Sequence, residues 1–552
     1  MLEVIGAPDM ETLISETIPD AIRLDRPLNL PAALNERDYL RHMRARSMEN
    51  EVWSTYIGLG YNPTVTPAVI RRNILENPGW YTPYTPYQAE IAQGRLAALL
   101  NFQTAIIDMT ALPIANASLL DEGTAAAEAM LLFFHELNKR KVTRPVFWVD
   151  AACLPQTINV VQTKAEPLGI KVKIAEPSSF EVDESCFGAL LQYPGQEGQV
   201  EDPTAVIESV KAVGGYVAMA CDLLSLAMLK APGELGADAA VGSAQRFGVP
   251  MFYGGPHAAF FATKDEFKRK IPGRIIGVSV DAEGNRALRM ALQTREQHIR
   301  REKATSNICT AQALLAGMAG MYAVWHGEEG IRTIASTIHR QAVQLSATLT
   351  ALGFKIRHKS FFDTLCVDVG GSSNMEFIRD AAENAKINLR YFENGDIGIS
   401  LNECTSEDDI RALIDVFADS ARGSVPEAMN LDHSTIPAGL QRKSNFLSHP
   451  VFSSYRSETE MMRYIKKLEN RDIGLTHSMI PLGSCTMKLN AASELEPVSY
   501  PGFAELHPFA PKEQTQGYAA IISDLEKYLC EITRFDACSL QPNSGAQGET
   551  PG

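Results

Sequence analysis

Six short apolar runs, separated by helical intervals, dominate the stretch between residues 145 and 262. Strands that alternate with helices in this way fold into a mostly parallel sheet with right-handed crossovers. A loop rich in glycine and proline (242–256) joins the last two runs, which predicts one strand entering a stiff turn and another leaving it. Ligands of α/β proteins bind in loops at strand ends, so we expect a site near this loop. The predicted strands are 146–150, 170–174, 189–193, 216–221, 239–242 and 258–262.

The composition indicates a soluble protein of several domains. The chain has 552 residues, of which 45% are hydrophobic and 21% charged. A net charge of −15 argues against nucleic acid and anionic membranes as partners. The nine cysteines form no CxxC pair and no Cys/His cluster with metal spacing, which predicts free thiols and no metal site. Because we find no signal or transit peptide and no apolar run of transmembrane length, we expect a cytoplasmic protein.

The pattern along the chain divides it into five parts. Residues 1–60 show helical spacing with mixed charge, which predicts an N-terminal helical arm. Residues 61–328 carry the large α/β domain, and 329–420 alternate short strands and helices as a smaller α+β domain. Residues 421–444 have the composition of a linker. Residues 445–552 open a second copy, and because that copy has no predicted sheet we expect residues 440–552 to pack loosely.

An internal repeat with an offset of 423 residues relates the two copies. It is carried by Glu90, Gln93, Gly94, Ala97 and Thr110, which recur as Glu513, Gln516, Gly517, Ala520 and Thr533. At this offset, the first copy has Asp121 and Glu122 at a predicted helix start, where carboxylates would repel a phosphate. The second copy instead has a serine and two glycines, which let backbone N–H groups approach an anion. We therefore predict a phosphate cradle only in the second copy, at Ser544, Gly545, Ala546 and Gln547.

Three segments resemble one enzyme family. The loop GSAQRFGVPMFYGGPHAAFF (242–261) is similar to the α-type half of the P-protein of the glycine cleavage system, a glycine dehydrogenase (aminomethyl-transferring). The segment NPGWYTPYTPYQAEIAQGR (77–95) resembles a stretch that lines the route to the active site in that family. The motif PLGSCTMKLN (481–490) resembles the opening of the catalytic β-type half. The resemblance covers nearly the whole chain and implies a full α-type half followed by the start of a β-type half.

This resemblance implies a fold-type I transferase that depends on pyridoxal phosphate (PLP). In the β-type half, the loop after the sheet carries the lysine that forms a Schiff base with PLP. Here Gln245 stands at that place, and an amide cannot form a Schiff base. Asp222 follows a predicted strand at the position where such enzymes hold the pyridinium nitrogen. Without the lysine, we interpret Asp222 as a relic of the cofactor site or as a structural residue.

Five further side chains are candidates for a pocket. Tyr81 and Tyr84 lie in a loop rich in proline and aromatic residues, which is either a rigid pocket wall or a brace between domains. The polar residues of the PLGSCTMKLN turn either line the same pocket or serve ordinary turn geometry. These are Ser484, Cys485 and Thr486.

The family's activity is glycine decarboxylation, with transfer of the aminomethyl group to the lipoyl arm of H-protein. The implied partners are H-protein, the T- and L-proteins through it, and a second copy in a homodimer. The chain ends before the place of the PLP lysine, so we expect a truncated and inactive form. The alternative is a non-catalytic α-type subunit that shapes a lysine-bearing partner, and the start of a second copy counts against it. A fold-type I enzyme with a different chemistry at Gln245 is a third possibility, against which PLGSCTMKLN argues.

Overall fold

A mostly parallel, seven-stranded sheet forms the centre of the computed structural model, in the order β2-β8-β7-β6-β5-β3-β4. Strands β3 to β7 are parallel, and β8 is antiparallel to β7. The six predicted strands are confirmed, with ends that differ by at most three residues. The bounds of the seven strands are β2 Ile114–Ala115, β3 Val146–Asp150, β4 Lys171–Ala175, β5 Cys186–Tyr193, β6 Tyr216–Cys221, β7 Ala239–Ser243 and β8 Ala259–Thr263.

The structure describes most of the chain. The described residues are 1–24, 26–81, 86, 88–138, 143–293, 297–304, 306, 308, 311–420, 434–477, 479, 489–542 and 548.

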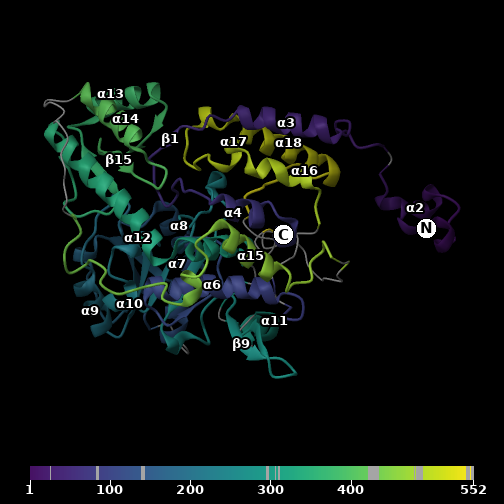
Figure 1. Cartoon of the computed structure of the whole chain (residues 1–552), viewed down its shortest axis with the longest axis horizontal. Coiled ribbons are helices and arrows are strands. Elements are labelled where there is room, and N and C mark those ends of the chain that lie inside the picture. Colours follow the sequence, from purple (N-terminus) through teal and green to yellow (C-terminus); the bar gives the residue numbers. More distant parts are fainter. Residues whose placement is uncertain are drawn as a thin grey trace.

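Helices cover both faces of the large sheet and form two apolar cores with it. Figure 1 shows α6, α7, α8 and α12 in the main body of the molecule. Helices α6 and α12 belong to one core, and α7 and α8 to the other. Helix α12 begins at Ala313, and Gly327 interrupts it with a positive φ of 59°. The bounds are α4 Ala68–Ile70, α5 Pro78–Tyr81, α6 Gln93–Thr110, α7 Glu122–Leu137, α8 Pro155–Ala165, α9 Thr204–Ala212, α10 Pro232–Leu235, α11 Gln297–Arg300 and α12 Ala313–Ala351.

The smaller α+β domain has a four-stranded sheet in the order β11-β12-β15-β14, packed with α13 and α14. Ser406 caps α14, because its hydroxyl accepts the Asp409 N–H while the Asp409 carboxylate accepts the Ser406 N–H. A hairpin, β9-β10, lies outside both sheets. The bounds are β9 Ile276–Val280, β10 Arg286–Met290, β11 Lys355–Ile356, β12 Thr364–Asp368, α13 Ser372–Asn384, β13 Ile387–Asn388, β14 Arg390–Tyr391, β15 Ile397–Ser400 and α14 Glu407–Ala418.

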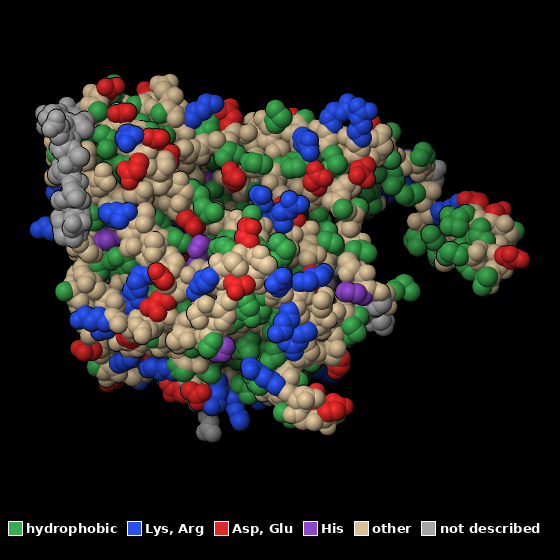
Figure 2. Space-filling view, in the orientation of Figure 1, with side chains coloured by type: hydrophobic (Ala, Val, Ile, Leu, Met, Phe, Trp, Pro, Cys, Tyr) green, Lys and Arg blue, Asp and Glu red, His purple; other side chains and the backbone are tan. Residues whose placement is uncertain are grey.

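The N-terminal arm is helical, as predicted, and its first helices stand apart from the body. Figure 2 shows them as a separate lobe beside the rest of the molecule. The arm and the second copy comprise α1 Leu2–Ile5, α2 Met10–Thr17, α3 Glu36–Met48, β1 Ser54–Thr55, α15 Glu458–Glu469, α16 Ala492–Leu495, α17 Pro501–Ala504 and α18 Gln516–Thr533. Within the described ranges, none of the helices has the length and apolarity that crossing a bilayer requires.

Residues 440–472 pack tightly on the first copy, so the expectation of loose packing is wrong for this segment. Phe446 and Ile465 are buried in the core shared with α6 and α12. The guanidinium of Arg442 donates to the carbonyls of Met109 at 2.6 Å and Asp108 at 2.8 Å, which end α6. A buried cation at the C-terminus of a helix satisfies carbonyls that have no partner within the helix.

The two copies exchange their first long helices. Helix α3 of the first copy packs on α18, and α15 of the second copy packs on α6. The contacts repeat: the Asp472 carboxylate accepts the Gly94 N–H at 2.6 Å, and the Asn50 side-chain carbonyl accepts the Tyr518 N–H at 3.1 Å. Both helices therefore have their first backbone donors capped by the other copy. The sequence repeat is thus a structural repeat, related by reciprocal exchange.

Candidate active site

Gln245 occupies a tight pocket directly after β7. Its side chain is 1% exposed, and its oxygen accepts the Asn62 N–H at 3.0 Å. Its nitrogen donates to the carbonyl of Asn62 at 2.8 Å and to that of Val249 at 2.7 Å. The amide therefore pairs with the Asn62 backbone through its oxygen and one N–H, much as one strand pairs with another, and it donates its second N–H to Val249. A lysine would lose the acceptor, so this position is built for an amide and not for an amine.

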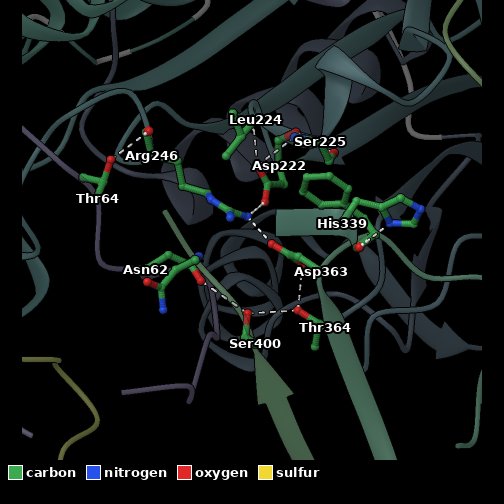
Figure 3. Close-up of polar contacts among 12 residues, drawn as sticks. Asn62, Thr64, Asp222, Leu224, Ser225, Arg246, His339, Asp363, Thr364 and Ser400 are labelled. Carbon is green, nitrogen blue, oxygen red and sulfur yellow. Dashed lines mark hydrogen bonds and ion pairs between the residues drawn. The ribbon is translucent and has the colours of Figure 1, made fainter. Parts of the chain in front are cut away.

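The next residue, Arg246, joins the large and small domains through two carboxylates (Figure 3). Asp222 follows β6 of the large sheet, and Asp363 directly precedes β12 of the small one. One guanidinium nitrogen lies 2.5 Å from the Asp363 carboxylate and makes a short ion pair with Asp222. Burial lowers the pKa of Arg246, but the two carboxylates more than offset this effect, so its pKa is raised above the usual value.

The first copy does not fit PLP. The aspartate that would hold a pyridinium nitrogen, Asp222, is already paired with the Arg246 cation, and its other oxygen accepts the Leu224 N–H at 2.8 Å. Gln245 supplies no amine. At the place that corresponds to the phosphate cradle predicted in the second copy, Asp121 caps α7 by accepting the Thr124 N–H at 2.7 Å, so a carboxylate closes the helix start. The phosphate, the pyridine ring and the aldehyde of PLP would therefore each meet an unsuitable group in the first copy.

A cavity of about 1910 Å³ lies between the first copy and the second. Glu122 lines it from the start of α7, and burial raises the pKa of this carboxyl to about 7, although the Thr157 hydroxyl donates to it at 2.9 Å. Tyr81 is also in the wall and is buried. Residues 492–500 and 540–542 contribute from the second copy. Among the residues that the structure describes, no group of three or more His, Cys, Asp or Glu side chains is arranged to hold a metal ion.

Most of the predicted site residues lie outside the described residues. The structure places Gln245 and Tyr81 as stated above, and the other eight predicted site residues are outside the described ranges. These are Tyr84, Ser484, Cys485, Thr486, Ser544, Gly545, Ala546 and Gln547.

The sequence reasoning missed Arg246 and Asp363. Arg246 stands beside Gln245 in the loop that resembles the P-protein family, but its role depends on the Asp363 carboxylate, 117 positions further along the chain. An arginine inside an otherwise apolar loop was the one local signal, because a buried guanidinium needs carboxylate partners.

The large parallel sheet, the smaller α+β domain and the site position after β7 define an α/β protein of fold type I. The model of the family "Glycine cleavage system P-protein" matches residues 1–417. The chain belongs to this family.

Curated relatives and a solved structure agree with the family model. The chain is 55% identical to glycine dehydrogenase (decarboxylating) of Christiangramia forsetii, covering 100% of this chain and 58% of that protein. It is also 55% identical to the enzyme of the same name from Thermosynechococcus vestitus, covering 100% of this chain and 57% of that protein. The chain therefore spans less than two thirds of the length of these relatives.

Among solved structures, a glycine decarboxylase (P-protein) of the glycine cleavage system, in inhibitor-bound form, matches with a TM-score of 0.70 and 33% identity. The match covers 76% of this chain and 97% of the other.

Proposed function

We propose that this chain serves glycine decarboxylation coupled to aminomethyl transfer onto the lipoyl group of H-protein, and that its first copy is the non-catalytic half. The observation that carries the second part is the pairing of Gln245 with Asn62 beside the Arg246 ion pairs. The relatives named glycine dehydrogenase (decarboxylating) support the first part. PLP, when bound, supplies an electron sink for the negative charge that forms at the α-carbon as CO2 leaves.

The residues that would hold PLP belong to the second copy. Ser544, Gly545, Ala546 and Gln547 would cradle the phosphate with backbone N–H groups, since no carboxylate stands at their position in the repeat. At the offset of the internal repeat, two residues of PLGSCTMKLN correspond to residues of the first copy: Ser484 corresponds to Tyr61, and Cys485 corresponds to Asn62.

Asn62 is the residue whose backbone pairs with Gln245, and Tyr61 lines the cavity beside Glu122. In the second copy, Ser484, Cys485 and Thr486 would accordingly face the lysine loop and the cradle. Tyr81, with Tyr84, would form a wall of the pocket between the copies, which agrees with the burial of Tyr81 at the cavity.

The proposed partners follow from the reaction. Glycine is the substrate, H-protein presents the lipoyl arm, and the T- and L-proteins act through H-protein. We place the protein in the cytoplasm as a homodimer, without nucleic acid or membrane partners, which agrees with its net charge of −15.

A second candidate function is that of an α-type subunit, which binds and shapes a separate subunit that carries the lysine. The observation that favours it is that the described lysine position of this chain holds Gln245. The two functions differ in what the chain does alone.

The test measures release of CO2 from labelled glycine with PLP and H-protein, first by the chain alone and then with a β-type P-protein subunit. Release by the chain alone supports the first function and refutes the expectation of an inactive chain. Release only after the addition supports the second function, and absence of release in both cases refutes the second function. Borohydride reduction with PLP followed by peptide mapping checks the first copy, where we expect no adduct. An adduct on a lysine between residues 61 and 420 would contradict the non-catalytic assignment.

A further inference from the structure

The cavity wall around Tyr81 is fastened to the second copy through a buried carboxylate. The short helix α5 carries Trp80 and Tyr81, which are both buried and both line the cavity. Asn77 caps this helix, because its side-chain oxygen accepts the Gly79 N–H at 2.9 Å. The side-chain nitrogen of the same residue donates to the carboxylate of Glu469 at 2.9 Å. The cap that orients α5 is therefore itself held by the last residue of α15.

The environment of Glu469 fixes its position relative to α5. A Cβ added at Gly79 would lie 2.7 Å from the carboxylate, so the glycine leaves the space that this group fills. The oxygen that does not bind Asn77 accepts a hydrogen bond from the ammonium of Lys466 at 2.6 Å. Each oxygen of the buried carboxylate thus has a donor, as a charged group removed from water requires.

A second carboxylate holds the other end of the same segment (77–95). Helix α15 lies beside α6 (Figure 1), and Asp472 follows three positions after Glu469. Its carboxylate accepts the Gly94 N–H and the guanidinium of Arg95, both at 2.6 Å. One turn of the second copy therefore holds both ends of the segment that contributes Tyr81 to the cavity wall.

Comparison of the two copies shows that this arrangement is not a general feature of their packing. At the offset of 423 residues α5 corresponds to α17, and both helices begin with proline, glycine and an aromatic residue. The fourth residue is Tyr81 in α5 but Ala504 in α17. Tyr500 stands at the place of Asn77 and makes no side-chain cap bond, and the glycine of α17 faces Ser47 instead of a carboxylate. Of these two described helices, the one held by a carboxylate is the one that presents a tyrosine.

We propose that Glu469 is a positioning residue, which sets the orientation of the wall that carries Tyr81, with Asp472 as the second anchor. The second copy thereby aligns a surface of the first copy beside the pocket between them. This inference rests on the proposed function, in which that wall borders the pocket where glycine reacts. Charge-assisted hydrogen bonds from buried groups fix direction as well as distance, and a small substrate needs a rigid wall for its orientation.

The orientation of the wall can be measured on the full chain without turnover. The chain has four tryptophans, so labelling with 5-fluorotryptophan gives a fluorine resonance for Trp80 that Trp80→Phe assigns. In Glu469→Ala, this resonance should shift or broaden, and the amides of α5 should exchange with solvent about fivefold faster, because the cap loses its partner. Glu469→Gln keeps an acceptor for Asn77 and should restore both signals. Lys467→Ala, exposed on the same turn of α15, is the matched control and should change neither.

An unchanged Trp80 resonance together with unchanged exchange in Glu469→Ala would overturn the proposal. Equal changes in Glu469→Gln would also overturn it, since any alteration of α15 would then have the same effect. Neither result depends on the proposed reaction, whose failure would appear only as absent release of CO2. Where the chain releases CO2 with a β-type subunit, Glu469→Ala should raise the KM for glycine about tenfold and leave kcat within about twofold. An unchanged kcat/KM in that assay would refute the positioning role.

Discussion

Replacing Arg246 with methionine removes the cation that two buried carboxylates share, while it keeps most of the side-chain volume. The Asp363 side chain is only 7% exposed and Asp222 is 23% exposed, so water replaces the lost cation poorly. Removing one partner of a buried ion pair costs about 3–5 kcal/mol. Because the loss falls mainly on Asp363, we expect the free energy of unfolding to drop by about 4 kcal/mol at pH 7.5.

The pH dependence of this loss has a defined sign. In Arg246→Met, burial without the cation raises the pKa of Asp363 above its value in the unfolded chain, so the folded state binds a proton more readily. Such a group contributes stability that is present at low pH and is lost as the pH rises through the folded pKa. The penalty of the variant relative to wild type should therefore be smaller at pH 5 than at pH 7.5.

The assay is urea unfolding followed by tryptophan fluorescence at the two pH values. Arg411→Met is a matched control, because it breaks an exposed ion pair with Asp408 and should cost at most about 0.5 kcal/mol. Adding Asp222→Asn and Asp363→Asn to Arg246→Met should recover most of the loss, since no buried charge then remains unpaired. A cost for Arg246→Met as small as that of the control, or a penalty that grows at pH 5, would refute this account.

Three further predictions concern the cap of α6, two buried histidines and the lysine position. Asp472→Ala removes the acceptor of the Gly94 N–H and the carboxylate at 2.6 Å from the guanidinium of Arg95. Urea unfolding should therefore show a free energy of unfolding that is lower by about 3 kcal/mol. An equal loss in Asp472→Asn, which keeps an acceptor, would contradict the role of Asp472 as a helix cap. Burial lowers the pKa of His257 and of His507 to about 4, so the unfolded chain binds more protons than the folded chain below pH 6.5. The free energy of unfolding should therefore fall by about 2 kcal/mol per histidine between pH 7 and pH 5, and it should fall less steeply in His507→Gln. A flat pH profile would count against burial of the neutral rings. Gln245→Lys should yield no PLP adduct at residue 245 after borohydride reduction, because the Asp222 carboxylate already forms an ion pair with Arg246. A mapped adduct would show that the first copy still accepts the cofactor.

The sequence by itself predicted the strands, the small domain and the repeat. Each of these rests on a signal in the sequence itself: apolar runs bounded by glycine and proline, the alternation of short strands and helices in residues 329–420, and identities at a fixed offset. The prediction that Gln245 stands at the lysine position required only the family loop. Such signals depend on residues that are near one another in the chain or on a one-to-one correspondence along it, so they survive without knowledge of the fold.

Only the tertiary structure decided how these parts are held together. The Arg246 pairs, the capping of α6 by Asp472 and Arg442, and the exchange of α3 and α15 join residues that lie between about 24 and 470 positions apart. Whether a carboxylate caps a helix or faces solvent depends on the path of the whole chain, which no local periodicity specifies.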